Sequence, residues 1–436
     1  MTEPHLEFHP RAAAWRTRDF TTLDHDDLAD RERLGLPTDR PVVMLGHQPG
    51  FWHPGIVAKL FAASAAADKH GATLAWLVID TDDTDPAEIR IPVLGEDGGL
   101  RVNAWSFGGG RSSVPAPSAT RDPIDPVSPD GLRHALECAE HRLHAAVKAL
   151  RSHRHARSIA AQFTRAAIGL LGLHAPLLVF ASDLPDTNAY QRAVDAMRRS
   201  PSDVASRYNK AVHAFPDAGV SQLRVGDDAE LPLWRVSSGG TRLPMRASQL
   251  GSAKSWPRAL LTSGIARASL CDLFVHGSGG KAYEPINDGW LPETLHATLA
   301  PFTAATATIV PRFPGRGISA REAARALWRA QHAEHHPGVV GDTDAERARE
   351  SLVREIEHLP RDSVERAEAF GALHDLIADH RRRNSPSLGT LAEAAAVAKQ
   401  AAAEQPLRND RTWSFLMHDA DAIRDLAAMV ASRTNE

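Results

Sequence analysis

Two histidines lie in a glycine-containing segment near the start of the sequence, Gly46-His47-Gln48-Pro49-Gly50-Phe51-Trp52-His53-Pro54-Gly55. An apolar run precedes this segment, and a helical pattern from Ile56 to Lys69 follows it. In α/β proteins a strand, a glycine loop and a helix start form an anion site, because free backbone N–H groups and the helix dipole attract negative charge. His47 and His53 add proton donors, so this segment predicts chemistry on a phosphate or carboxylate.

The local sequence also indicates where His53 lies. Pro54 suits the first turn of a helix, where its missing N–H is not needed, and this puts His53 near the N-cap. Gly50 and Gly55 permit a close approach of the backbone to a ligand. The alternative is structural: His47 and Gln48 satisfy loop backbone groups, and His53 only caps the helix.

An acidic cluster, Asp80-Thr81-Asp82-Asp83-Thr84-Asp85, directly follows a second apolar run. The carboxyl end of a parallel strand is where open α/β sheets bind their ligands. Crowded carboxylates raise one another's pKa values, which suits a general base or a site for an ammonium group or a metal. We expect Asp80 and Asp82 to be functional, and Asp83 and Asp85 to be solvated. The alternative is a polar turn.

A third segment, Leu270–His276, reads as a buried strand that runs into Gly277-Ser278-Gly279-Gly280-Lys281. The glycines expose backbone N–H groups and Lys281 adds a cation, which predicts a second substrate or phosphate contact. The segment is not a phosphate-binding P-loop, since Val275 stands at the required first glycine and Ala282 at the Ser or Thr. The alternative is a tight turn in which Tyr283 simply packs.

The composition narrows the function classes. The chain has 436 residues, a net charge of −4 and two cysteines, Cys138 and Cys271. These values favour a cytoplasmic protein of small-molecule function, and give no reason to expect a nucleic-acid partner, a disulfide framework or a structural zinc site. No apolar run is long enough for a membrane span, so no membrane partner is expected. We also expect no metal site, because Glu137, His141 and His144 match no zinc spacing.

Apolar runs and helical patterns alternate over most of the chain, which predicts an α/β fold with a parallel sheet. Residues 1–40 read as a lead-in, residues 41–310 as the core with a mobile loop at 108–131, and residues 318–436 as a helical region. Predicted strands of the core are 41–46, 74–80, 89–93, 100–107, 177–180, paired strands within 219–244, and 270–276. Predicted helices are 23–33, 54–70, 132–150, 157–171, 186–199, 204–215, 257–268, 320–333, 344–358, 361–382, 388–403 and 418–432.

The helical region after the Pro311–Gly317 boundary carries an apolar stripe that includes Leu352, Ile356, Phe370 and Leu373. A break at 384–386 turns one helix into the next, which predicts an antiparallel hairpin. The stripe leaves two alternatives open, a homodimer contact through these C-terminal helices or packing within the same chain.

Taken together, these segments resemble the bacillithiol-biosynthesis cysteine-adding enzymes (BshC). That family has an early Gly-Gln-Gln-x-Gly loop and a helix with a Lys, matched here by Gly46-His47-Gln48-Pro49-Gly50 and Lys59. Its acidic cluster is matched by 80–83. Its Arg-Pro segment and late glycine loop are matched by Pro257-Arg258 and the 277–283 segment. His47 stands at a family Gln, Lys281 at a Pro, and Tyr283 at a Glu.

The resemblance covers residues 41–291 and implies a Rossmann-like core of the nucleotidyltransferase type with a C-terminal coiled-coil-like region. It also implies a ligase that forms a C–N bond between an amino acid or acyl group and an amine. The alternatives are a nucleotidyltransferase or adenylating enzyme, and a non-catalytic nucleotide- or metabolite-binding dimer. The cofactor is left open, with ATP or ADP as candidates. The expected substrate- or nucleotide-binding residues are Gly46, Gln48, Gly50, Gly55, Lys59, Arg258, His276, Gly277, Gly279, Gly280, Lys281 and Tyr283, and the expected catalytic residues are His47, His53, Asp80 and Asp82.

Overall fold

The computed structural model describes residues 4–109, 116–237, 241–315 and 317–436. Its contacts divide the chain into two compact units. The first unit contains Met1–Ile91, Asn103–Arg312 and Arg411–Glu436, and the second contains Pro92–Val102 and Phe313–Asp410. This division differs from the expected one, since the last helix belongs to the first unit and not to the C-terminal helical region.

The first unit is built on a sheet that has six strands among the described residues, in the order β1-β11-β10-β2-β3-β6. The five strands from β11 to β6 run parallel, and β1 pairs antiparallel with β11. The strands are β1 (His5–His9), β2 (Val42–His47), β3 (Thr73–Val78), β6 (Leu177–Phe180), β10 (Leu273–His276) and β11 (Phe302–Thr308). The expected α/β class with a mostly parallel sheet is therefore confirmed.

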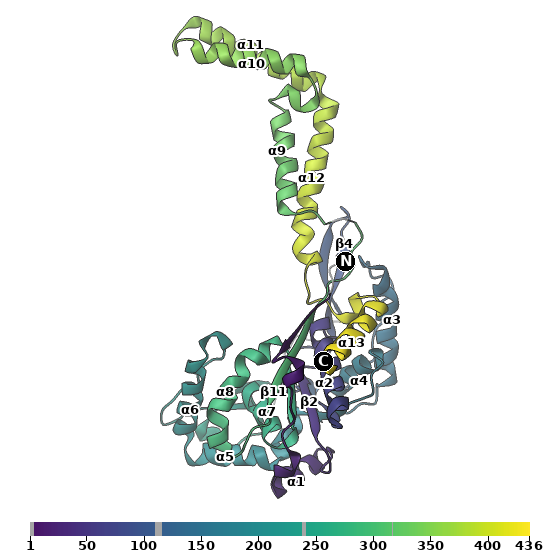
Figure 1. The fold of residues 1–436 in the computed structure, drawn as a ribbon, viewed down its shortest axis with the longest axis vertical. Helices are drawn as coiled ribbons and strands as arrows, with labels where there is room; N and C mark the ends of the chain where they lie inside the picture. The colour runs from purple at the N-terminus through teal and green to yellow at the C-terminus, as the bar shows by residue number, and fades with distance from the viewer. Residues whose placement is uncertain (1–3, 110–115, 238–240, 316) are drawn as a thin grey trace. The chain divides into compact units, whose positions relative to one another are not determined.

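Helices cover both faces of this sheet (Figure 1). Val42 and Met44 of β2 point into a core shared with α5 (Asn188–Arg199), α6 (Pro201–Ala214), α7 (Ala259–Ile265) and α8 (Ser278–Leu295). Side chains alternate along a strand, so Val43 and Leu45 point to the opposite face. There α2 (Pro54–His70) lies along the sheet, and α13 (Ala420–Asn435) packs on α2.

The remaining elements of the first unit surround this three-layered core. They are the helices α1 (His25–Arg33), α3 (Glu137–Ser152) and α4 (Ile159–Leu170), and a three-stranded sheet of β7 (Glu230–Val236), β8 (Arg242–Arg246) and β9 (Ser255–Pro257). A two-stranded sheet of β4 (Glu88–Leu94) and β5 (Leu100–Ser106) crosses the boundary between the units. Of the expected mobile loop at 108–131, residues 110–115 lie outside the described residues.

Two elements next to the predicted β10 strand were not expected from the sequence. Helix α8 starts directly after Gly277, and β11 follows it. Pro285 and Pro292 lie inside α8 and hide its helical pattern, because proline is rare in helix interiors. The glycine segment is therefore a helix start rather than a tight turn.

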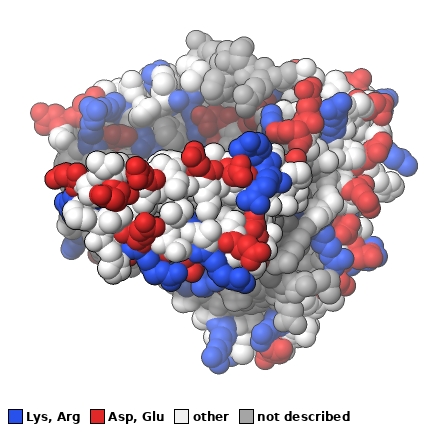
Figure 2. All heavy atoms as spheres, turned by 90° about the horizontal axis from the view of Figure 1, so that it is seen from above, with Lys and Arg blue, Asp and Glu red and all other residues white. Residues whose placement is uncertain are grey.

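The second unit is helical apart from the tip of the β4–β5 sheet. Its helices are α9 (Ala320–Ala333), α10 (Thr343–His358), α11 (Val364–Arg383) and α12 (Ser385–Arg408). Helices α9 and α12 lie along one another, and α10 and α11 form a second pair (Figure 1). The break at Asn384 separates α11 from α12 as predicted. Basic and acidic side chains are interspersed on the face shown in Figure 2.

Within the described ranges, none of the helices combines the length and the apolar character needed to cross a bilayer.

Candidate functional site

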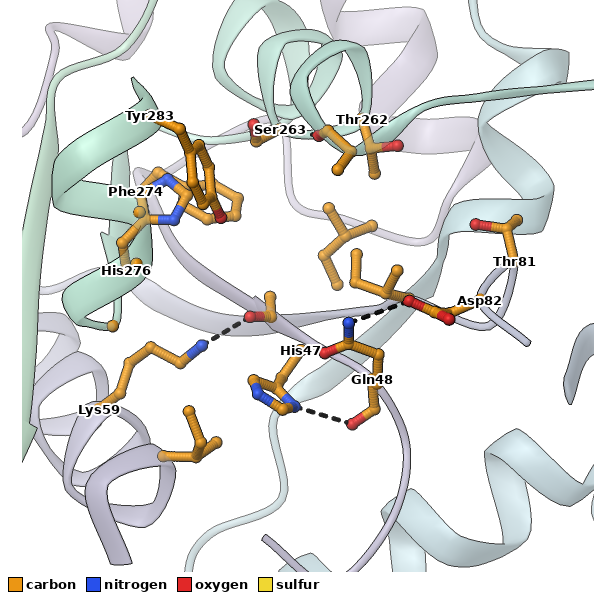
Figure 3. A pocket seen from close by; sticks show the side chains of 18 of the residues that line it. His47, Gln48, Lys59, Thr81, Asp82, Thr262, Ser263, Phe274, His276 and Tyr283 are labelled. Carbon is orange, nitrogen blue, oxygen red and sulfur yellow. Dashed lines mark hydrogen bonds between the residues drawn. The ribbon is translucent and has the colours of Figure 1, made fainter. Parts of the chain in front are cut away.

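A cavity of about 300 Å³ lies in the first unit where β2, β3 and β10 end (Figure 3). The chain runs from β2 through β3 to β6 on one side, and then crosses to β10 and β11 on the other. The strand order therefore reverses between β2 and β10. Open α/β sheets bind ligands at such a reversal, outside the carboxyl ends of the strands. The cavity is lined by Gly46, His47, Gln48, His53, Ile56, Lys59, Leu77, Ile79, Thr81, Asp82, Trp234, Arg242, Pro257, Ala259, Thr262, Ser263, Phe274, His276, Gly277, Ser278, Gly279, Gly280, Tyr283 and Thr306.

The end of β2 contributes His47 and Gln48. The Nδ1 atom of His47 lies 3.1 Å from the carbonyl oxygen of Gln48, which also accepts a hydrogen bond from Trp52 Nε1 at 2.7 Å. Burial lowers the pKa of His47 to about 3, and the nearby charge of Lys59 lowers it further. His47 is therefore an uncharged imidazole at neutral pH, able to donate or accept a hydrogen bond.

His53 is the N-cap of α2, as the sequence predicts. Its Nδ1 accepts a hydrogen bond from the backbone N–H of Gly55 at 3.1 Å, and Pro54 occupies the first turn. His53 therefore both caps α2 and lines the cavity. Gly55 and Gly50 do not line the cavity. A Cβ on Gly55 would lie 2.8 Å from Thr306 Oγ1, so this glycine allows α2 to approach β11.

Lys59 reaches the cavity from α2 with its side chain almost wholly buried, at 2% exposure. Its Nζ donates a hydrogen bond to the carbonyl oxygen of Gly46 at 2.6 Å. Burial lowers the pKa of Lys59 to about 7. A lysine in this state exchanges its proton near neutral pH, in contrast to a lysine in water.

The two carboxylates expected to act together lie in different places. Asp82 lines the cavity, accepts a hydrogen bond from Gln48 Nε2 at 3.1 Å, and lies 3.5 Å from Arg242 Nη2. Burial raises the pKa of Asp82, but the hydrogen bond from Gln48 and the charge of Arg242 outweigh this effect and lower it. Asp82 is therefore ionised at neutral pH.

Asp80 is fully buried and does not line the cavity. Its carboxylate accepts hydrogen bonds from the backbone N–H of Ser182 at 2.9 Å and from Ser182 Oγ at 2.6 Å. Burial raises the pKa of Asp80 to about 6. The structure thus places Asp80 outside the cavity, where both of its oxygens fasten the end of β3 to the segment after β6.

The start of α8 forms the wall that β10 leads to. Gly277 is the N-cap, and no side chain in the described part of the chain caps this helix. The first backbone N–H groups of α8 therefore remain open to the cavity that Gly277, Gly279 and Gly280 line. An 18-residue helix with open N–H groups attracts an anion through its dipole.

Lys281 does not supply the cation expected at this wall. Its side chain is exposed and is not among the residues that line the cavity. Gly280 and Glu284 are buried on the inner face of α8, and Lys281 lies on the outer face of the same helix. Arg258 is also absent from the lining. Its guanidinium pairs with Glu230 at 2.7 Å and donates to the Leu233 carbonyl.

A buried charge network supports the α8 wall from behind. Glu284 pairs with Arg267 Nη1 at 2.6 Å and accepts a hydrogen bond from Ser263 Oγ. His276 Nε2 lies 3.2 Å from Glu284 Oε1, yet it makes no hydrogen bond of acceptable angle. Burial raises the pKa of Glu284, but His276, Arg267 and Ser263 outweigh it and hold the value at about 2. Burial lowers the pKa of His276, against the opposing effect of Glu284.

Sequence reasoning missed the side chains that reach the cavity from β7, β8 and α7. Arg242 donates to Asp83 at 2.7 Å and lies over the ring of Trp234, with 4.8 Å between its Cζ and the ring centroid. Ser263 and Thr262 come from α7 (Figure 3). The only local signal was the paired-strand pattern at 219–244, and that pattern does not reveal which side chains meet the ends of β2 and β3.

The cavity brings together most of the site residues that were expected from the sequence. It unites His47, His53, Asp82, Gly46, Gln48, Lys59, His276, Gly277, Gly279, Gly280 and Tyr283, and it leaves out Asp80, Gly50, Gly55, Arg258 and Lys281. The uncharged imidazole of His47 lines the same cavity as an ionised Asp82 and the open amides of α8. This arrangement can hold a cation and an anion at once and can move a proton between them.

Among the described residues, no group of three or more His, Cys, Asp or Glu side chains is placed to hold a metal ion. Comparisons of the chain with protein-family models and with curated proteins find no match.

Proposed function

We propose that the chain is a ligase that forms a C–N bond between an acyl group, carried by a substrate with a phosphate or carboxylate, and an amine. The amine binds as an ammonium group at Asp82, loses a proton to solvent, and attacks the acyl carbon as the bond from that carbon to its leaving group breaks. The anionic group binds at the start of α8. His47 stabilises the negative charge that develops on the acyl oxygen. The proposal rests on groups of one cavity, so no large movement of the chain is needed for the two substrates to meet.

One observation carries this proposal. The open N-terminus of α8 and the ionised Asp82 line the same cavity and come from different sides of it (Figure 3). Amide dipoles at a helix start favour an anion, and a carboxylate favours an ammonium group. A site with both suits a reaction that joins an anionic substrate to an amine better than it suits a single simple anion.

The uncharged imidazole of His47 supports the chemical step. A neutral imidazole such as His47 can donate a hydrogen bond to a developing oxyanion, and such electrostatic stabilisation is often the largest catalytic contribution. His53 uses Nδ1 for the cap of α2 and also lines the cavity. Its place beside the start of α2 suits a contact with the anionic leaving group.

The proposal extends to a relationship with the bacillithiol-biosynthesis cysteine-adding enzymes and to a core of the nucleotidyltransferase type. The support is the strand order. Numbered along the chain, the parallel strands lie in the order 3-2-1-4-5, which is the order of the doubly wound nucleotide-binding folds. ATP or ADP is the cofactor that such a core would take.

A second candidate is a nucleotidyltransferase or adenylating enzyme without acyl transfer. The observation that favours it is His53, which caps the first helix after the first parallel strand, at the reversal point of the sheet. There a histidine and the helix dipole act together on a phosphate.

Isothermal titration with ATP, ADP and AMP tests these proposals, followed by mass spectrometry of mixtures that contain amino acids and amine acceptors. The ligase predicts nucleotide binding and an amide product with release of ADP or pyrophosphate. A nucleotidyltransferase predicts pyrophosphate release without an amide. Binding without turnover, unchanged by His53→Ala, contradicts both enzymes and supports a binding protein.

Homodimerisation through the second unit is a further part of the proposal. Trp328 on α9 and Val397 on α12 are 58% and 64% exposed and offer apolar surface to a second copy of the chain. Light scattering after size-exclusion chromatography gives the molar mass of the particle in solution and so distinguishes a dimer from a monomer. Trp328→Glu should convert a dimer to a monomer, and a wild-type monomer at all concentrations contradicts this part.

A further inference from the structure

Lys59 lies in the cavity without a counter-charge. Its Nζ makes one hydrogen bond, to the uncharged carbonyl of Gly46, and burial is the single cause of the change in its proton affinity. Within the described ranges, no carboxylate pairs with it. A buried ammonium group without a partner is costly, so a lysine placed in this way is poised to lose its proton.

The start of α8 lies in the same cavity and also lacks a partner. Its first N–H groups have no capping side chain, and the buried His276 nearby has an Nε2 without a hydrogen bond, at 5% exposure of the residue. In Figure 3 Lys59 and His276 lie on the same side of the cavity, and Asp82 lies on the other. Lys59 Nζ and the first N–H groups of α8 are therefore donors on one side of the cavity, while His276 Nε2 faces Glu284 Oε1 at 3.2 Å.

We propose that this side of the cavity binds the phosphate group of a ligand together with one proton, and that the proton resides on Lys59 Nζ. This proposal rests on the proposed function, because it assumes that the start of α8 binds an anion. A phosphate has three acceptor oxygens and two negative charges, which match the amides of α8 and the ammonium group of Lys59. A carboxylate offers fewer acceptors and half the charge.

We assign the proton to Lys59 because the neighbouring titratable groups are either uncharged or already paired. His47 is far from protonation at neutral pH, since its pKa is about 3, and burial also lowers the pKa of His276. Glu284 is already balanced by Arg267, and Asp82 by Gln48 and Arg242. The other titratable groups at the cavity are His53, which is used as a cap, and Tyr283, whose pKa is raised by burial.

Binding and protonation are then linked. The pKa of Lys59 is about 7 in the free protein, and a phosphate dianion beside Nζ raises it. At a pH between the Lys59 pKa of the free protein and that of the complex, Lys59 takes up a proton as the ligand binds. Affinity therefore falls about tenfold for each pH unit above the lower value, because the proton becomes scarcer.

Calorimetry in buffers with different enthalpies of ionisation measures this proton directly. The probes are inorganic phosphate and AMP at pH 8, titrated into the full-length protein. We expect uptake of close to one proton per AMP, and an affinity that falls about tenfold from pH 8 to pH 9. Inorganic phosphate should show the same uptake with weaker binding. No binding of either probe, or binding without uptake, overturns the proposal.

Three variants locate the proton. Lys59→Met should remove the uptake and the pH dependence and weaken binding at least tenfold. Lys59→Arg keeps a permanent charge, so it should bind AMP without uptake. Lys281→Ala removes one positive charge from the exposed face of α8, the helix whose start lines the cavity, and should behave as wild type. Full uptake in Lys59→Met places the proton elsewhere and contradicts the proposal.

A measurement on the wild-type chain guards against a variant that fails to fold. Acetic anhydride modifies only uncharged amines, and peptide mass spectrometry reads the extent at Lys59 across pH. Half-maximal modification near pH 7 is expected in the free protein, with protection by AMP. A Lys59 profile like that of surface lysines contradicts the proposal. Proton-linked AMP binding without turnover leaves the inference intact and removes the proposed ligase.

Discussion

The imidazole of His276 lies so close to Gly280 that a Cβ on Gly280 would come within 2.3 Å of its Nδ1. His276 ends β10, and Gly280 belongs to the first turn of α8. The absence of a side chain at this position allows the helix start to lie on the ring. The ring and the open amides of α8 are therefore fixed relative to one another before any ligand arrives.

Gly280→Ala should disrupt this contact. The methyl group overlaps backbone-proximal ring atoms that cannot move freely, so we expect a loss of about 1–3 kcal/mol in unfolding free energy and a clear loss of AMP binding. Gly279→Ala is the matched control, since its Cβ would meet nothing closer than Tyr283 at 3.9 Å. Urea denaturation and calorimetry measure both effects. Equal behaviour of the two variants contradicts the role of Gly280.

Asp82 and Asp80 should respond differently to the same substitution. Asp82→Asn removes the charge proposed to bind the ammonium group, so kcat/KM should fall at least tenfold while stability changes little. Asp80→Asn keeps an acceptor for the Ser182 N–H and a donor for its hydroxyl. We expect full activity in Asp80→Asn, and release of ADP or pyrophosphate measures the activity of both variants.

The pH dependence of stability provides a second readout for Asp80. Its folded pKa is about 6, above the ordinary value of 3.8, so the folded state binds more protons between these values. Asp80 therefore destabilises the fold as the pH rises from about 4 to 6, and Asp80→Asn should remove this loss. If Asp80→Asn abolished activity without unfolding, the structural assignment of Asp80 would fall.

Lys59→Met should stabilise the fold in a pH-dependent way. The folded pKa of Lys59 is about 7 and its ordinary value is 10.5, so the unfolded chain binds more protons between them. Wild-type stability therefore rises with pH in this window, by up to about 1.4 kcal/mol per unit. The excess stability of Lys59→Met should shrink at that rate in urea titrations from pH 7.5 to 9.5. A stability difference between Lys59→Met and wild type that does not change with pH would contradict the burial of Lys59 without a counter-charge.

The return of α13 to the first unit should be important for stability. Ile423, Leu426 and Val430 are buried on α13, which packs on α2. Leu426→Ala should lower the unfolding free energy by about 2–4 kcal/mol, since it leaves a cavity in a packed layer. The exposed Asp425→Ala on the same helix should stay within about 0.5 kcal/mol of wild type. Thermal unfolding monitored by circular dichroism compares the two.

The elements around the site could be predicted where the local pattern was strong. Helix α2 begins at Pro54 and ends at His70 as predicted, because a proline at its start and Gly71 after its end leave little choice. The position of His53 at the N-cap followed from the same signal. The start of α8 was harder, since its internal prolines hide a helix that packs on α5, α6, α7, β10 and β11.

The roles of individual charged side chains could not be read from the sequence. Asp80 and Asp82 are two residues apart, yet Asp80 is occupied by Ser182, which is 102 positions further along the chain. Lys59 and Lys281 were both expected at the site, and only Lys59 lines the cavity, for a similar reason. The phase of α8 puts Lys281 outside, whereas the packing of α2 on the sheet puts Lys59 inside. Arg242 lies in the paired-strand pattern at 219–244, which does not show that its side chain reaches the cavity.

The sequence also does not show which helices beyond residue 311 pack on one another. An amphipathic pattern predicts a buried face but not its partner, so 418–432 looked like the other C-terminal helices. In the structure the corresponding helix, α13, packs on α2.

Arg411 donates a hydrogen bond from Nη1 to Thr308 Oγ1 at 3.1 Å, and both residues belong to the first unit. The chain thus departs after residue 312 and returns at 411 beside the place it left. Closure of such a loop costs little more for a long insert than for a short one. Residues 313–410 therefore behave as a replaceable module between two fixed anchor points. Another helical pair or a short turn can be grafted there, with the tip at 92–102 trimmed to match, while the strand order that forms the cavity is kept.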